Sequence, residues 1–110
     1  MIVHICERVA WEQAQRSGEY RPASLAAEGF IHASEPPQVL EVANRYYAGK
    51  QDLLLLWIDP QRVDPEIRYE PVDGDLFPHI YGALNLEAVV EAYPFPPDTD
   101  GIFRQLPPRA

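Results

Sequence analysis

The feature that most constrains the fold of this chain is an unbroken apolar run at its centre, which extends from Leu53 to Ile58. Polar residues precede the run, and Asp59-Pro60 ends it. A segment this short is too brief for a typical buried helix, and a strand buried on both faces shows no polar alternation. The run therefore predicts a central strand over residues 53–59.

Shorter patterned segments predict the elements around this strand. Apolar residues at helical spacing predict two helices, over residues 8–16 and about 36–48. Short apolar or alternating segments predict strands at residues 2–6, 30–33, 67–70, 77–82 and 88–93. The segment at 67–70 is typical of an edge strand, and Asp73-Gly74-Asp75 predicts the turn that follows it.

The order of these elements predicts an α+β fold with two main helices and a split, curved, mostly antiparallel sheet. No linker or repeat divides the chain, so residues 1–93 are expected to form a single domain. The proline-rich residues 94–110 are expected to pack on it as an extended tail, anchored by Phe95, Ile102 and Phe103.

The charge balance limits the possible partners. Among 110 residues, 17 are acidic and 9 are Lys or Arg, which gives a formal net charge of −8. Such a field repels a polyanion, so nucleic acid binding is disfavoured. A small nucleotide-like ligand remains compatible, because one phosphate needs only one or two arginines. The oligomeric state is left open.

The single cysteine and the short apolar segments indicate the compartment. Cys6 cannot form an intramolecular disulfide, which fits a reducing cytoplasm. The start of the chain has no signal-peptide pattern, and Leu53 to Ile58 is far too short to cross a bilayer. A cytoplasmic protein without membrane contact is expected.

Three histidines, His4, His32 and His79, each lie in a predicted apolar strand. A buried imidazole is costly unless its nitrogens find partners, so any one of them alone is best explained as a satisfied core residue. Three in similar settings favour a shared site. They come from separate elements with no carboxylate at short ligand spacing, so no metal is expected.

His32 lies in Gly29-Phe30-Ile31-His32-Ala33-Ser34, a strand that leads into the second helix. Ser34 is expected either to cap that helix or to help bind a polar ligand near its start. Arg45 follows on the same helix and is a candidate for a phosphate or carboxylate. The alternative is a surface pair with Glu41, four residues earlier.

A second group combines a carboxylate, an imidazole and a phenol in Glu70, His79 and Tyr81. These side chains suit contacts to a ribose or an aromatic base. The alternative is that Tyr81 and Phe77 are core residues. The predicted cleft is lined by His4, His32, Ser34, Arg45, His79 and Tyr81.

Together these motifs resemble the domain-of-unknown-function family 952, from about His4 to Tyr93. The resemblance depends mainly on Gly29-Phe30-Ile31-His32-Ala33-Ser34 and on Phe77-Pro78-His79-Ile80-Tyr81-Gly82, in that order. That family in turn is similar to the ADP-ribosyltransferase fold, and most of all to the tRNA 2′-phosphotransferases, which use NAD. His32-Ala33-Ser34 matches the His-x-Ser pattern of those relatives, whereas His4 precedes Ile5-Cys6 where they have Gly-Thr.

The resemblance implies roles for the site residues. His4 would contact a ribose hydroxyl and the nicotinamide amide of NAD, and His32 with Ser34 would seat the nicotinamide ribose. Arg45 would bind a phosphate, and Glu70 is a candidate catalytic glutamate by position. The function expected from this resemblance is transfer or hydrolysis of the ADP-ribosyl group of NAD. The alternative is a protein that binds a nucleotide or small anionic metabolite without turnover, or an interaction module with structural histidines.

Overall fold

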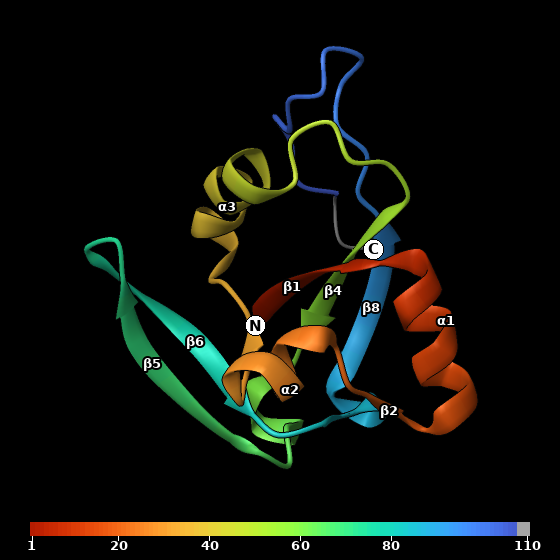
Figure 1. The fold of residues 1–110 in the computed structure, drawn as a ribbon, viewed down its shortest axis with the longest axis vertical. Helices are drawn as coiled ribbons and strands as arrows, with labels where there is room; N and C mark the ends of the chain where they lie inside the picture. The colour runs from red at the N-terminus through yellow and green to blue at the C-terminus, as the bar shows by residue number, and fades with distance from the viewer. Residues whose placement is uncertain (108–110) are drawn as a thin grey trace.

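The computed structural model describes residues 1–107, and its central sheet has three antiparallel strands in the order β1-β4-β8 (Figure 1). These are β1 (Ile2–Glu7), β4 (Leu53–Ile58) and β8 (Val89–Pro94). Every residue of β4 is buried, because the strand has a hydrogen-bonded neighbour on each edge and packed side chains on each face. The predicted central strand is confirmed.

Alternate residues of β4 point to opposite faces of this sheet and enter two apolar clusters. On one face, Leu56 belongs to a cluster with Ala14 of helix α1 (Arg8–Ser17). On the other face, Leu55 belongs to a cluster with Ala43 of helix α3 (Val39–Tyr46). The central sheet is therefore covered on both sides, which explains why its middle strand is apolar throughout.

The predicted helix over residues 36–48 is divided into two parts. A 3-10 turn at Pro36–Gln38 precedes α3. The prediction that Ser34 caps this helix is wrong, because Glu35 holds the N-cap position and its backbone N–H donates to the Gln38 side chain at 2.9 Å. Ser34 instead pairs through its backbone with Val3, with both N···O distances at 2.8 Å.

A second antiparallel sheet has the order β3-β6-β5 and projects beside the central one (Figure 1). Its strands are β3 (Ile31–His32), β6 (Asp75–Tyr81) and β5 (Glu66–Val72). Asp73 and Gly74, with φ of 51° and 83°, form the two-residue turn of the β5–β6 hairpin, a conformation that suits a right-handed strand twist. The predicted turn and edge strand are confirmed.

The remaining elements are short and connect these parts. They are helix α2 (Ala23–Glu28), strands β2 (Glu19–Tyr20) and β7 (Leu84–Asn85), which pair with each other, and 3-10 turns at Pro60–Arg62 and Leu86–Ala88. The structure is thus α+β with mostly antiparallel sheets, as predicted. Within residues 1–107, no helix is long and apolar enough to span a bilayer.

The segment after β8 packs on the α3 side of the central sheet. Phe95 and Phe103 are buried there, and the Asn44 amide bonds the backbone N–H and C=O of Phe103 at 2.7 and 2.8 Å. Ile102, predicted as a third anchor, is 42% exposed, so that assignment is wrong. Residues 108–110 of the predicted tail lie outside the described residues.

Candidate functional site

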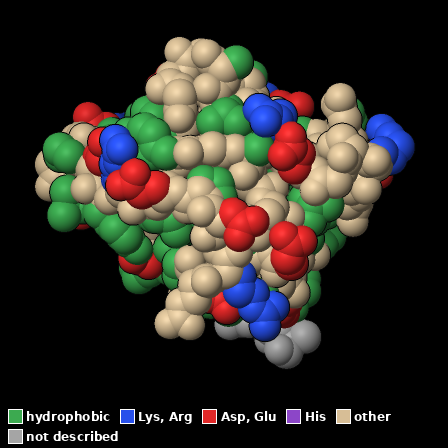
Figure 2. All heavy atoms as spheres, turned by 90° about the horizontal axis from the view of Figure 1, so that it is seen from below, with side chains coloured by type: hydrophobic (Ala, Val, Ile, Leu, Met, Phe, Trp, Pro, Cys, Tyr) green, Lys and Arg blue, Asp and Glu red, His purple; other side chains and the backbone are tan. Residues whose placement is uncertain are grey.

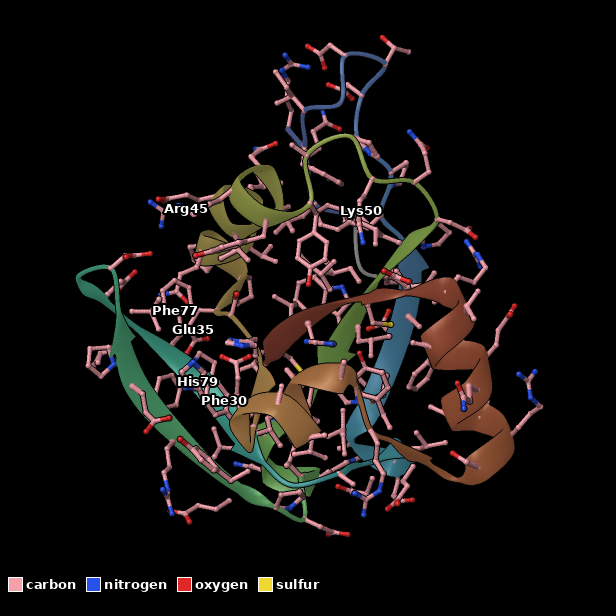
Figure 3. The ribbon with its side chains drawn as sticks, in the orientation of Figure 1. Phe30, Glu35, Arg45, Lys50, Phe77 and His79 are labelled. Atoms are coloured by element: carbon pink, nitrogen blue, oxygen red, sulfur yellow. The ribbon has the colours of Figure 1, made fainter. Side chains whose placement is uncertain are left out.

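A cavity of about 870 Å³ lies between α3, the β5–β6 hairpin, the middle of β1 and the end of β3. The pairing of Val3 with Ser34 fixes the start of β1 against the segment that follows β3. Figure 3 shows Arg45 on α3 and Phe77 and His79 on β6 at this place. His4, His32 and His79 all line the cavity, and we call it the histidine cavity.

His4 uses both of its ring nitrogens inside the protein. Its side chain is buried, and Nδ1 donates to the backbone carbonyl of His32. Nε2 then accepts from the Tyr20 hydroxyl at 2.8 Å. Burial lowers the pKa of His4 to about 4, and it raises the pKa of Tyr20 and of the Cys6 thiol. His4 is therefore a neutral residue that ties β1 to β2 and β3.

His32 is the accessible histidine of the cavity, with about half of its side chain exposed. Its Nε2 lies 2.8 Å from Glu28 Oε2, at the end of α2. His32 is paired with His79 across β3 and β6, and the two ring centroids are 5.4 Å apart. The imidazole of His32 thus stands at the cavity wall with a carboxylate beside it.

His79 is held by a carboxylate and by an aromatic ring. Glu70 accepts from the Tyr81 hydroxyl and from His79 Nδ1, the latter at 2.7 Å, and these two bonds lower the pKa of Glu70. Because the ionised carboxylate can only accept, Nδ1 carries a proton, and in the neutral imidazole Nε2 has the lone pair. Phe30 stacks on the imidazole with a centroid distance of 4.1 Å and fixes its plane.

The second nitrogen of His79 is the unusual atom of this group. The residue is only 4% exposed, and Nε2 has no hydrogen-bond partner among the described residues. Nδ1 is directed to Glu70 on β5, and on the other side of β6 the ring of His32 lies 5.4 Å from that of His79. A buried acceptor without a partner is costly, so it is rarely kept without a use.

Ser34 and Arg45 both line the cavity, but they are held in place by different contacts. Ser34 is 5% exposed and is held by its backbone. Arg45 pairs with Asp73 of the hairpin turn at 2.5 Å, so the alternative pairing with Glu41 on its own helix is wrong. Gln38 also bonds the hairpin, through Asp75 at 2.8 Å. These contacts connect α3 and the 3-10 turn before it to the hairpin at the edge of the cavity.

The structure brings together five of the seven predicted site residues: His4, His32, Ser34, Arg45 and His79 all line the cavity. Glu70 and Tyr81 stand behind His79 and are not part of the lining. No group of three or more His, Cys, Asp or Glu residues within residues 1–107 is placed to hold a metal ion.

Sequence reasoning missed the acidic part of the lining. Four carboxylates among residues 1–107 line the cavity, and they belong to Glu28, Glu41, Asp73 and Asp75. The Asp-Gly-Asp segment predicted only a turn. Nothing in that segment indicates that α3 lies opposite the turn, which is what places Asp73 and Asp75 in the cavity lining. A hairpin register counted from that turn places Glu70 and His79 on one face, so their contact was predictable.

The sequence of this chain matches a known protein family. Residues 5–92 match the family described as "Protein of unknown function (DUF952)", and the chain belongs to this family, as the motifs predicted. None of the curated proteins matches the chain.

Solved structures of one related protein show the same fold. It is protein CC0527 from Caulobacter crescentus, whose crystal structure is 30% identical to this chain with a TM-score of 0.86. The match covers 94% of this chain and 92% of that one. The crystal structure of a double mutant of CC0527 and its solution NMR structure give TM-scores of 0.85 and 0.81 at the same identity, with the same 94% of this chain and 92% and 90% of theirs covered.

Proposed function

We propose that the histidine cavity binds the nicotinamide ribose end of NAD and that the protein transfers or hydrolyses the ADP-ribosyl group. The observation that carries this proposal is that one cavity gathers His32, Ser34 and His79 next to several carboxylates. Its volume of about 870 Å³ suits a ligand of nucleoside size or larger.

The reaction places specific demands on the site. The bond between the ribose C1′ and the ring nitrogen breaks, nicotinamide leaves with the electron pair, and positive charge develops on the ribose. Carboxylates such as Glu28 stabilise that charge electrostatically. A water or other acceptor then forms the new bond to C1′ and loses a proton. His32 can take this proton at Nδ1, because Nε2 donates to Glu28.

The finer fold assignment is part of the same proposal. We regard the arrangement of three small antiparallel sheets, two of which are linked by the bridge between Val3 and Ser34, as an ADP-ribosyltransferase-like split sheet. In this arrangement His4 is a positioning residue, since its hydrogen bond fixes the backbone carbonyl of His32. Glu70 is likewise a positioning residue, because it acts through His79.

The test is calorimetric titration with NAD and ADP-ribose, together with chromatographic measurement of released nicotinamide. We expect saturable NAD binding and slow release, both lost in His32→Ala while the melting temperature holds. Glu12→Gln, on the exposed surface of α1 and outside the cavity, serves as control and is expected to behave as wild type. Absence of NAD binding at millimolar concentration contradicts the proposal.

A second candidate is binding without turnover. It is favoured by one observation: both nitrogens of His4 are engaged in internal hydrogen bonds, so this residue acts structurally and not on a ligand. The same experiment separates the candidates. NAD binding that is lost in His32→Ala, with no nicotinamide released by the wild type, supports the binding protein.

A further inference from the structure

The charges that line the histidine cavity are mainly negative. Among residues 1–107, four carboxylates and one guanidinium line it. That guanidinium belongs to Arg45 and is already paired with Asp73 at 2.5 Å. Glu28, Glu41 and Asp75 then remain as negative charges without an arginine or lysine in the lining to balance them. A phosphate that entered would meet these carboxylates, whereas a cation would be attracted.

The exposed surface does not offset the negative charge of the cavity lining. On the face shown in Figure 2, most Lys and Arg side chains lie beside Asp or Glu side chains instead of forming a basic patch. Named pairs of this kind are Arg8 with Asp52 and Arg68 with Glu66, at 2.8 and 3.0 Å. Cations on the described surface are therefore largely compensated locally and do not neutralise the cavity.

An independent observation is the lone pair of His79 Nε2. This atom is buried, has no partner among the described residues, and belongs to a side chain of the cavity lining. Glu70 holds the other nitrogen at 2.7 Å and Phe30 fixes the ring, so the acceptor is preorganised. An N–H donor on the ligand would satisfy it, and a phosphate oxygen without a proton would not.

Aromatic side chains complete the lining. Phe77, Tyr46 and Tyr47 border the same cavity, which also has an apolar floor that includes Val3 and Ile5. Aromatic faces attract organic cations through their electron-rich surfaces, and flat heterocycles also stack on them. Carboxylates combined with aromatic rings form the usual environment of an organic cation.

We propose that the histidine cavity selects a cationic nitrogen heterocycle that bears an N–H donor, and that it disfavours free phosphates. The carboxylates of the lining attract the charge of the ring, and His79 Nε2, which is buried in this structure, accepts from the donor after the neighbouring side chains shift. The inference rests on the proposed function in one respect, because it names the pyridinium carboxamide end of the substrate as the part that this cavity recognises.

The experiment compares two probes of equal shape. The probe 1-methylnicotinamide carries a positive ring, and 3-methylbenzamide is its neutral isostere with the same carboxamide. Calorimetric titration of the wild-type protein is expected to show the cation binding about tenfold more tightly, with the difference reduced by added salt. Inorganic phosphate and ADP-ribose are added as competitors and are expected to displace the cation poorly.

Two variants separate the two parts of the proposal. Glu41→Gln removes one carboxylate of the lining, and we expect it to reduce the preference for the cation about threefold. Glu12→Gln makes the same charge change outside the cavity and is expected to keep the preference. His79→Asn keeps a donor for Glu70 but removes the Nε2 acceptor, so both probes are expected to weaken about tenfold with their ratio unchanged.

The outcomes also distinguish this inference from the proposed function. Equal affinity for the two probes, no binding of either, or strong displacement by phosphate overturns the inference. Unchanged binding in a folded His79→Asn variant overturns the role of Nε2. Preference for the cation without nicotinamide release from NAD leaves the inference standing while the proposed turnover fails. Turnover of NAD without that preference supports the proposed function and overturns the inference about the cation.

Discussion

The two larger sheets of this protein have similar backbone pairing but opposite surroundings. The central sheet β1-β4-β8 is covered on both faces, and β4 has no exposed residue. In the β3-β6-β5 sheet, Ile80 points into the core, whereas Phe77 and His79 on the other face of β6 line the cavity. Among the described residues, the central sheet thus buries both faces in apolar packing and reaches the cavity only through β1, whereas the other sheet turns one face of β6 to the cavity.

This difference shows where the molecule tolerates an unsatisfied polar atom. The lone pair of His79 Nε2 is costly where it lies, and the apolar packing of the central sheet can offset that cost. The predictions below test the comparison by changing matched positions in the two regions, beginning with the largest expected effect.

The largest effect is expected at the centre of β4. Leu55→Ala removes a fully buried side chain between α3 and the C-terminal segment, and close packing leaves a cavity behind. We expect the free energy of unfolding to fall by about 2–5 kcal/mol, as measured by urea denaturation. The matched change Leu76→Ala, on β6 at a side chain that is 53% exposed, is expected to stay within about 0.5 kcal/mol. Similar losses at both positions would contradict the comparison.

A pH effect is expected at His4, where the two sheets meet. Burial lowers the pKa of His4 from 6.5 to about 4, so between these values the unfolded chain binds a proton that the folded chain does not. The contribution of His4 to stability is therefore complete above pH 6.5 and is lost as the pH falls to about 4. The total loss is about 3 kcal/mol. The nearby Tyr20 and Cys6 stay neutral in this range, because burial raises both pKa values.

The measurement is urea denaturation of wild type and His4→Gln at several pH values between 7 and 4. The carboxylates and the other two histidines are common to both proteins, so the difference between their slopes isolates His4. A wild-type stability that falls no more steeply than that of the variant would show that His4 titrates normally in the folded state.

A smaller effect is expected for the hydroxyl that satisfies His4. Tyr20→Phe leaves the buried Nε2 of His4 without its donor at 2.8 Å, which is expected to cost about 1–3 kcal/mol of unfolding free energy. Tyr69→Phe removes a hydroxyl that bonds Glu35 at 2.8 Å, and because the Tyr69 side chain is about half exposed, water can replace that bond. Thermal denaturation of both variants tests this, and an equal loss in the two would contradict it.

The central sheet was largely predictable from the sequence, because its pattern is local. An unbroken apolar run of this length favours a buried strand over a helix, and β4 ends at Ile58, within one residue of the prediction. The three histidines were also recognisable, since each is a polar residue in an apolar strand. The Ser34 cap was not, because Glu35 and Gln38 one and four residues later compete for the same role.

The electrostatics of the cavity depend on tertiary contacts and could not be predicted in this way. Arg45 and Asp73 are 28 residues apart and meet only because α3 packs over the hairpin turn. The sequence left two alternatives for Arg45, a surface pair with Glu41 four residues earlier and a bound phosphate or carboxylate. The structure instead shows the arginine already occupied and the remaining acids exposed to the cavity.

The smallest stability effect is expected at this Arg45–Asp73 pair. Both side chains are about half exposed, so Arg45→Gln should change the free energy of unfolding by less than about 1 kcal/mol. Its effect on binding should be clear, because it removes the cation of the lining and frees Asp73. We expect 1-methylnicotinamide to bind more tightly to this variant than to wild type in calorimetric titration. Weaker binding would mean that Arg45 itself contacts the probe, and it would contradict the argument that the negative charge of the lining attracts the cation.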